Sequence, residues 1–222
     1  SIELNATFYK MPDWPQVETW RDKTPAHFRF FPKVTDVVTH YRRLVNVKEL
    51  TDAFANAVSH FGDKLGMAFL QLPDNFKPKD FDRLEKVLPE FPKNFPLAVE
   101  VRNTEWFAPE MMDRFAGLLE SLQMANIIVD TAGRRDMLHM RLTGPVAFVR
   151  YVGANHPSDA DRLDEWVDRI ATWKAQGLQK LYFFVHQNVE VESPLLAAHF
   201  IEGLNRKLGL SLSLPQRPGT LL

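Results

Sequence analysis

A carboxylate and a guanidinium stand two positions apart at the end of a short apolar run. In the segment from Leu97 to Arg102, Glu100 and Arg102 alternate with apolar residues. Successive side chains of a strand point to opposite faces, so this spacing predicts that Glu100 and Arg102 share one face. Charged groups are costly to bury unless they are paired or used. The pattern predicts that Glu100 moves protons and Arg102 grips an anion, although pairing with neighbouring strands would leave the same pattern.

Polar residues end the other apolar runs in the same way. The candidate proton carriers are Glu100, His186 and Asp130, and the candidate substrate-binding residues are Asn5, Lys33, His40, Arg43, Gln71, Arg102 and Arg150. Such a set of cations suits a phosphate, sulfate or carboxylate group. Structural roles stay open: Gln71 or Asn5 could cap backbone groups, and His186 could be a satisfied core histidine. The grouping, more than any single member, favours a site for a small anion.

Seven strands and six helices are expected to position these residues. Strands are predicted at Ile2–Phe8, His27–Lys33, Met67–Leu72, around Leu97–Arg102, at Ala125–Asp130, Val146–Val152 and Lys180–His186. Helices are predicted at Trp14–Lys23, Val47–Phe61, Lys79–Phe91, Pro109–Leu122, Asp159–Gln176 and Pro194–Leu208. The segment 35–46 is expected to be a loop, 139–141 is ambiguous between a short strand and an irregular segment, and the tail from Ser211 is expected to lie along the surface.

The alternation of strands with helices predicts an α/β fold whose parallel strands are joined by helical crossovers. The chain carries no glycine-rich dinucleotide fingerprint and no phosphate-binding loop after its first strand, which removes the main support for a Rossmann fold. We therefore expect one TIM-type (β/α) barrel domain over residues 1–222, with its first βα unit missing from this numbering. Active sites of such barrels lie at the C-terminal ends of the strands, where the polar candidates are found.

Composition excludes several classes of protein. The chain is 45% hydrophobic and 25% charged with a formal net charge of −1, so no overall basic field attracts nucleic acid or an anionic membrane. It has no cysteine, which excludes disulfides, thiolate metal sites and a cysteine nucleophile. No apolar run approaches the roughly 18 residues of a spanning helix. We expect a cytoplasmic protein without membrane association, and its oligomeric state is left open.

No cofactor is predicted. Glu100, Asp130 and His186 could form a carboxylate-rich site for a divalent ion, but the nearby cations disfavour a further positive charge. The chain also lacks the HxH and HExxH spacings of histidine-rich metal sites. No nucleophile elbow supports a catalytic triad.

Several runs match a known family in order along almost the whole chain. They are Glu3–Tyr9, Phe28–Lys33, Thr39–Leu44, Leu70–Pro73, Ala98–Asn103 with Trp106–Phe107, Val149–Gly153 and Tyr182–Gln187. In these runs the chain resembles the DUF72 family, also called YecE-like or UPF0759. The resemblance implies a TIM-type barrel and a missing opening segment. It supplies no reaction, because the family is best known as one of unknown function.

Three functions are compatible with these residues. The leading hypothesis is an enzyme that acts on a small anionic substrate, with a phosphate or carboxylate group and a sugar-like body, by acid–base chemistry. The second is a nucleic-acid-processing enzyme or binder whose cations grip a backbone phosphate, which near-neutral charge disfavours. The third is a non-catalytic sensor of a small molecule. Binding without turnover would separate the sensor from the enzyme.

Overall fold

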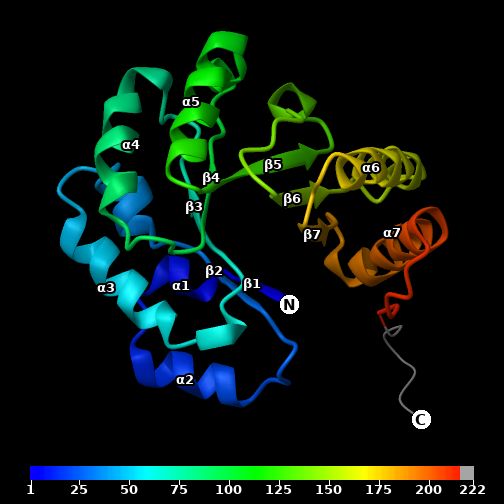
Figure 1. Cartoon of the computed structure of the whole chain (residues 1–222), viewed down its shortest axis with the longest axis horizontal. Helices are drawn as coiled ribbons and strands as arrows, with labels where there is room; N and C mark the ends of the chain where they lie inside the picture. Colours follow the sequence, from blue (N-terminus) through cyan, green and yellow to red (C-terminus); the bar gives the residue numbers. More distant parts are fainter. Residues whose placement is uncertain (216–222) are drawn as a thin grey trace. The chain divides into compact units, whose positions relative to one another are not determined.

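The structure is a computed structural model that describes residues 1–215, and it divides into two compact units (Figure 1). The first unit comprises residues 1–127 and 141–144, and the second comprises residues 128–140 and those from 145 onward. No helix of the described residues is long and apolar enough to cross a membrane.

The first unit is built on short parallel strands. Strand β1 (Ile2–Leu4) pairs with β2 (Phe30–Pro32), and β3 (Ala68–Gln71) pairs with β4 (Leu97–Glu100). Isolated parallel bridges join Phe30 of β2 to Leu65, and Lys33 to Phe69 of β3. Strand β4 also pairs with the start of β5 (Ala125–Thr131). The longer helices of this unit are α2 (Trp14–Asp22), α3 (Lys48–Ser59), α4 (Phe81–Val87) and α5 (Pro109–Ser121). The strands therefore follow one another in chain order.

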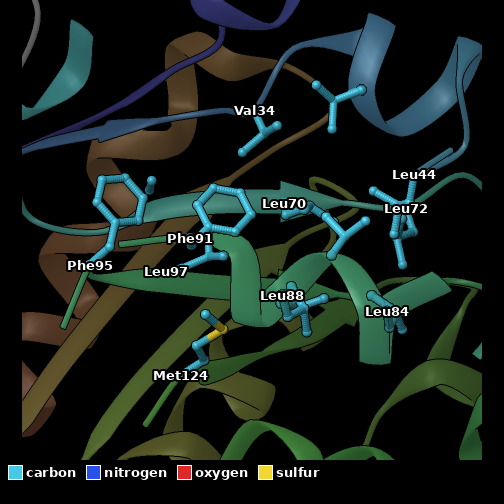
Figure 2. Packing of buried hydrophobic residues seen from close by; sticks show 14 of the residues in the cluster. Val34, Leu44, Leu70, Leu72, Leu84, Leu88, Phe91, Phe95, Leu97 and Met124 are labelled. Carbon is cyan, nitrogen blue, oxygen red and sulfur yellow. The ribbon is translucent and has the colours of Figure 1, made fainter. Parts of the chain in front are cut away.

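An apolar core holds these elements together. The predicted stripe of α3 is confirmed, because Phe54 and Val58 are fully buried and Phe61, just beyond the helix, is buried with them. Leu70 of β3 and Leu84 of α4 belong to the same cluster, part of which is drawn in Figure 2. This packing fixes the strand ends that carry the polar candidates.

The second unit contains the end of β5 and two long strands. Strand β6 (Val146–Val152) pairs with β7 (Lys180–His186) in parallel over seven residue pairs. Helix α6 (Ser158–Ala175) follows β6, and α7 (Ser193–Leu208) follows β7 and ends at Gly209, whose φ of 64° is left-handed. The rings of Phe183 in β7 and Phe200 in α7 lie 4.1 Å apart, so α7 packs on the strand that precedes it.

The predicted fold class is confirmed in its coarser form. The chain is an α/β protein with parallel sheets, and all seven predicted strands are present. The described strands show no closed barrel. The expected extent of one domain over residues 1–222 stays a prediction.

Three local predictions are wrong or incomplete. The strand from Ile2 stops at Leu4, because Asn5 adopts helical backbone angles and begins the short helix α1 (Ala6–Tyr9). The loop at 35–46 contains a π-helix over Val37–Tyr41. The helix expected at 79–91 is α4 with a 3₁₀ turn on each side, since Pro89 lacks the N–H needed to continue it.

The segment 139–141, which the sequence left open, forms no strand and is irregular; a 3₁₀ turn at Arg135–Met137 precedes it. The tail is held against α7 as far as Leu212, whose backbone exchanges two hydrogen bonds with the Asn205 side chain. Pro218, which belongs to the predicted surface tail, lies outside the described residues.

Candidate functional site

A row of polar side chains crosses three neighbouring strands of the first unit. Gln71 and Glu100 are the last residues of β3 and β4 and lie opposite each other in the parallel register. Lys33 directly follows β2 and donates from Nζ to Gln71 Oε1 at 2.6 Å, and Gln71 Nε2 donates to Glu100 Oε1 at 2.6 Å. Glu100 is fully buried. The amide of Gln71 therefore links an ammonium to a buried carboxylate.

Arg102 lies at the outer end of this row. Its Nη1 is 3.7 Å from Glu100 Oε1, and its Nε donates to Asp74 Oδ1 at 3.0 Å. The Arg102 side chain is 35% exposed and that of Asp74 is 61% exposed, so solvent reaches this pair. The predicted proximity of Glu100 and Arg102 is confirmed. The sequence did not identify Asp74, although it lies three residues after the end of β3.

The other side of Lys33 meets an aromatic ring. Lys33 Nζ lies 3.9 Å from the centroid of the Phe8 ring, and the His40 ring meets Phe8 edge to face at 5.1 Å. Buried Thr7 fixes this corner, because its Oγ1 is 2.8 Å from the Leu4 carbonyl oxygen and 2.7 Å from that of Lys33. The turn after β1 thus brings Phe8 and Lys33 together, a contact that the predicted longer strand did not foresee.

His40 lies on the π-helix that follows β2. Its Nδ1 is 2.8 Å from the hydroxyl oxygen of fully buried Thr39. Burial lowers the pKa of His40, and the charge of Lys33 lowers the pKa further. The imidazole is therefore neutral at pH 7. His40 contacts Phe8, which in turn contacts Lys33, so the structure brings this histidine to the polar row.

Two other predicted residues of the first unit have different surroundings. Arg43 has a left-handed φ of 49° and donates to Asn75 and, at 3.1 Å, to Asp80. Asp80 is buried and also pairs with Arg83 at 3.0 Å, so the guanidinium of Arg43 anchors its own loop. Asn5 is exposed at the turn that begins α1.

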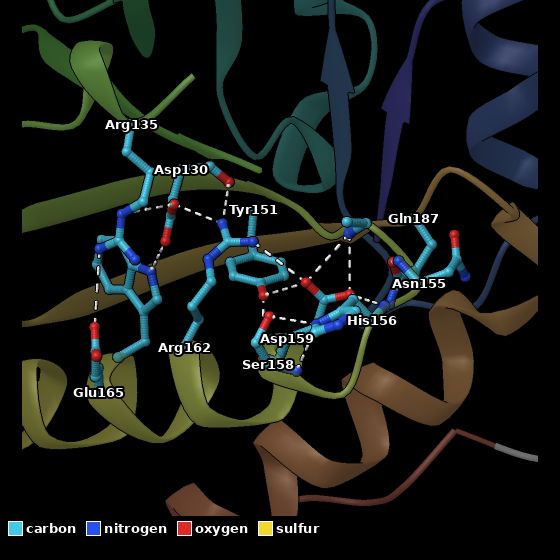
Figure 3. Close-up of polar contacts among 12 residues, drawn as sticks. Asp130, Arg135, Tyr151, Asn155, His156, Ser158, Asp159, Arg162, Glu165 and Gln187 are labelled. Atoms are coloured by element: carbon cyan, nitrogen blue, oxygen red, sulfur yellow. Dashed lines mark hydrogen bonds and ion pairs between the residues drawn. The ribbon is translucent and has the colours of Figure 1, made fainter. Parts of the chain in front are cut away.

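Asp130 in the second unit is the centre of a separate network (Figure 3). Its carboxylate accepts hydrogen bonds from Arg162 Nη2 at 2.6 Å and from Trp166 Nε1 at 2.8 Å, both on α6. Arg135 Nε is 4.0 Å away. Asp130 is 1% exposed, so these donors surround it. This geometry ties α6 to β5.

Asp159 organises the loop between β6 and α6 (Figure 3). Its carboxylate accepts from the backbone N–H groups of Ala154 and His156, both at 3.0 Å. A Cβ atom on Gly153 would collide with Gln187 Oε1 and lie 2.8 Å from Asp159 Oδ2, so any larger residue there would displace these two side chains. The hydroxyl of Tyr151 donates to the Asp159 carbonyl oxygen at 3.0 Å, and burial raises the pKa of Tyr151.

A cavity of about 340 Å³ opens beside this loop. Its lining includes His156, Gln187, Glu192, Leu195 and His199. The sequence interpretation assigned none of these residues to a site. Two of the segments that match the family, Val149–Gly153 and Tyr182–Gln187, end at this loop and could have indicated it.

Arg150 and His186 occupy the strands of the second unit. Arg150 lies opposite Phe184 in the register of β6 and β7. His186 ends β7, and its Nδ1 is 3.2 Å from Glu190 Oε1. Hydrogen bonds from Ser193 and His186 lower the pKa of Glu190 although burial opposes them. The site roles of Arg150 and His186 stay predictions.

The described residues contain no group of three or more histidine or acidic side chains arranged to hold a metal ion. Whether the protein uses a metal stays a prediction.

The chain is similar in sequence to proteins of one known family. A family profile described as "Protein of unknown function DUF72" matches residues 1–219. The chain belongs to the DUF72 family. UPF0759 protein YecE of Escherichia coli K12 is 26% identical over 239 residues, which cover 97% of this chain and 87% of YecE. UPF0759 protein YunF of Bacillus subtilis is 27% identical over 128 residues, which cover 54% of this chain and 45% of YunF.

Solved DUF72 structures resemble the chain as well. A DUF72 protein from Enterococcus faecalis V583 matches with a TM-score of 0.74 and 20% identity, covering 96% of this chain and 86% of that one. A DUF72 protein from Thermotoga maritima matches with a TM-score of 0.67 and 22% identity, covering 94% of this chain and 83% of that one. At this identity the likeness shows a shared fold. The profile match confirms the family resemblance seen in the sequence.

Proposed function

We propose that this DUF72 protein is an enzyme that acts on a small molecule bearing a phosphate or carboxylate group, by acid–base chemistry at the ends of β3 and β4. One observation supports the proposal most strongly. The fully buried carboxylate of Glu100 accepts a hydrogen bond from Gln71, which in turn accepts one from Lys33, and Arg102 lies beside the same carboxylate. Buried ionisable groups with specific charge partners are enriched at functional sites. Glu100 is the proposed acid or base.

The charges of this row suit exchange with a ligand. Lys33 and Arg102 are offset by Glu100 and Asp74. Exposed ion pairs such as Arg102–Asp74 contribute only about 0–1 kcal/mol. An incoming anion can therefore replace Asp74 at Arg102 at small cost, while buried Glu100 stays in place. Arginine offers such a group two parallel hydrogen bonds.

The remaining predicted residues take secondary roles in this proposal. Asp130 is the weakest candidate for proton transfer, because Arg162 and Trp166 occupy its carboxylate. The short link from Arg43 to Asp80 favours a role in shaping the loop that carries His40. Asn5, Arg150 and His186 remain proposed substrate contacts or proton carriers.

The barrel expected from the sequence also remains a proposal. Strands that run parallel and follow one another in chain order within each unit support it. A crystal structure of the protein that shows an open sheet would refute it.

Calorimetry with inorganic phosphate tests the proposed function. Arg102→Ala should abolish phosphate binding and leave the melting temperature within a few degrees of wild type, because this side chain is partly exposed to solvent and adds little to the core. Arg114→Ala is the matched control, since Arg114 forms an exposed pair with Glu85 on another part of the first unit. Wild-type affinity in Arg102→Ala, or its failure to fold, would show that Arg102 is a structural residue.

A further inference from the structure

We propose that His40, rather than Glu100, is the proton acceptor of this site, and that its Nε2 atom removes a proton lying next to the anionic group held by Lys33 and Arg102. This inference rests on the proposed function. It gives His40 a catalytic role in place of simple substrate binding. It also narrows the substrate to an anion with a removable proton beside its carboxylate or phosphate group.

We assign the proton-carrying nitrogen of His40 from the hydrogen bonds of Thr39. Thr39 Oγ1 is 3.1 Å from the Thr35 carbonyl oxygen and 2.8 Å from His40 Nδ1. A carbonyl oxygen can only accept, and a hydroxyl has a single hydrogen to donate. When that hydrogen goes to Thr35, Nδ1 must donate its own N–H to Thr39. The neutral imidazole then has its lone pair on Nε2.

The ring is also held in place. Thr39 is fully buried on the π-helix, and the edge-to-face contact with Phe8 fixes the other side of the imidazole. Among residues 1–215, no hydrogen bond to His40 Nε2 is present. A basic nitrogen whose partner nitrogen is anchored in this way has the arrangement of a general base.

The surrounding charges favour a neutral base that becomes more basic when an anion binds. Lys33 and Arg102 act on His40 as cations, and Asp36 and Asp74 act in the opposite sense. Burial and the cations keep the pKa of His40 below its usual value, so the lone pair is available at pH 7. A bound anion offsets the cations and stabilises the imidazolium that forms on proton transfer. Binding and proton acceptance are thus coupled.

Alkylation by iodoacetate tests this inference directly. The lone pair of Nε2 attacks the methylene carbon, the carbon–iodine bond breaks, iodide leaves, and the Nδ1 proton is released to solvent. The chain has no cysteine to consume the reagent, and the other histidines serve as internal controls. Mass spectrometry should show carboxymethylation of His40 first. The anionic reagent should react roughly tenfold or more faster than neutral iodoacetamide, because the two cations concentrate it.

Two variants of Thr39 examine the anchor. Thr39→Val keeps the shape but removes the hydroxyl, and it should slow alkylation of His40 several-fold. Thr39→Ser restores the hydroxyl and should restore the rate. In wild type, the pH dependence of the rate should show an apparent pKa below the usual value for histidine, and phosphate should protect His40.

The outcomes separate the two proposals. If phosphate binds but His40 reacts no faster than the other histidines, His40 is not the base and the anion site stands. If His40 is selectively alkylated by both reagents at equal rates, His40 is still supported as the base, but anion binding by Lys33 and Arg102 is contradicted. If neither phosphate binding nor selective alkylation is seen, both proposals are overturned.

Discussion

Among the residues that the structure describes, the least exposed carboxylates are those of Glu100, Asp130 and Asp159. Each is surrounded by donors, which is how proteins offset the cost of removing a charge from water. They differ in what the donors are. Asp159 is held largely by backbone N–H groups, Asp130 by side chains of α6, and Glu100 by an amide that itself contacts a lysine. The arrangement at Glu100 joins a lysine, through the amide and the carboxylate, to Arg102, whose side chain is 35% exposed.

Asp159 should make stability depend on pH. Burial alone would raise the pKa of Asp159, but hydrogen bonds from His156 and Ala154 and the charge of Arg162 hold it below its usual value. A depressed folded-state pKa stabilises the protein above the unfolded value of about 4, and that stability is lost as the pH falls through the folded-state pKa. Asp159→Asn should therefore lower the free energy of unfolding at pH 7 by about 1–3 kcal/mol.

Urea unfolding at pH 7 and at acidic pH measures this effect. The difference between wild type and Asp159→Asn should shrink as the pH falls. Asp168→Asn is the control, because Asp168 lies on the same helix in an exposed pair with Lys207. A constant difference across the pH range would mean that ionisation of Asp159 is not the cause.

At the scale of the elements, α3 tests how the first unit is packed. Phe54 is fully buried in the core cluster. Replacing it with alanine removes the ring and leaves a cavity, so Phe54→Ala should lower the free energy of unfolding by about 3–5 kcal/mol. Asn56→Ala, at an exposed position of the same helix, should change it by less than about 0.5 kcal/mol. A loss below about 1 kcal/mol for Phe54→Ala would show that the stripe is not core.

Long periodic elements were predictable from the sequence, and short irregular ones were not. The apolar repeat of α3 and the continuous runs of β6 and β7 are determined mostly by their own residues, and their bounds were nearly correct. The turn at Asn5 and the π-helix at Val37–Tyr41 depend on contacts with distant residues, such as the one from Thr7 to Lys33. The secondary-structure propensity of the local residues does not predict such long-range contacts.

The same division applies to the candidate site. Glu100 and Arg102 were expected together because strand periodicity alone places them, and Gln71 follows from the parallel register. Thr39 and Asp74 were not predicted, because they lie outside the strands, where the two-residue repeat of a strand gives no information about side-chain positions. The placement of Asp130 at a strand end was expected, but the donors that surround it come from a helix more than 30 residues later.

At the scale of the whole molecule, neither unit is a continuous stretch of chain. Strand β5 begins in the first unit and ends in the second, and residues 141–144 return to the first. Within the first unit, Thr143 Oγ1 donates to the Met124 carbonyl oxygen at 2.8 Å and accepts from the Asn126 backbone at 3.1 Å. Loss of structure in one unit should therefore release segments that belong to the other.

Hydrogen exchange should detect this linkage. Phe54→Ala, a change confined to the first unit, should speed amide exchange by similar factors in β3 and β4 and in β6 and β7, as one cooperative unfolding event predicts. Asn56→Ala again serves as the control. Faster exchange limited to β3 and β4 would show that the two units open independently.

Two buried tryptophans have a consequence for spectroscopy. Trp106 donates its indole N–H to the Phe76 carbonyl oxygen at 2.8 Å in the first unit, and Trp166 donates to Asp130 at the same distance in the second. An indole proton bonded to a neutral carbonyl and one bonded to a carboxylate resonate in different magnetic environments. Trp106 and Trp166 can thus serve as intrinsic NMR reporters of the first and the second unit, respectively. Ligand titrations can be followed at both without any label attached to the protein.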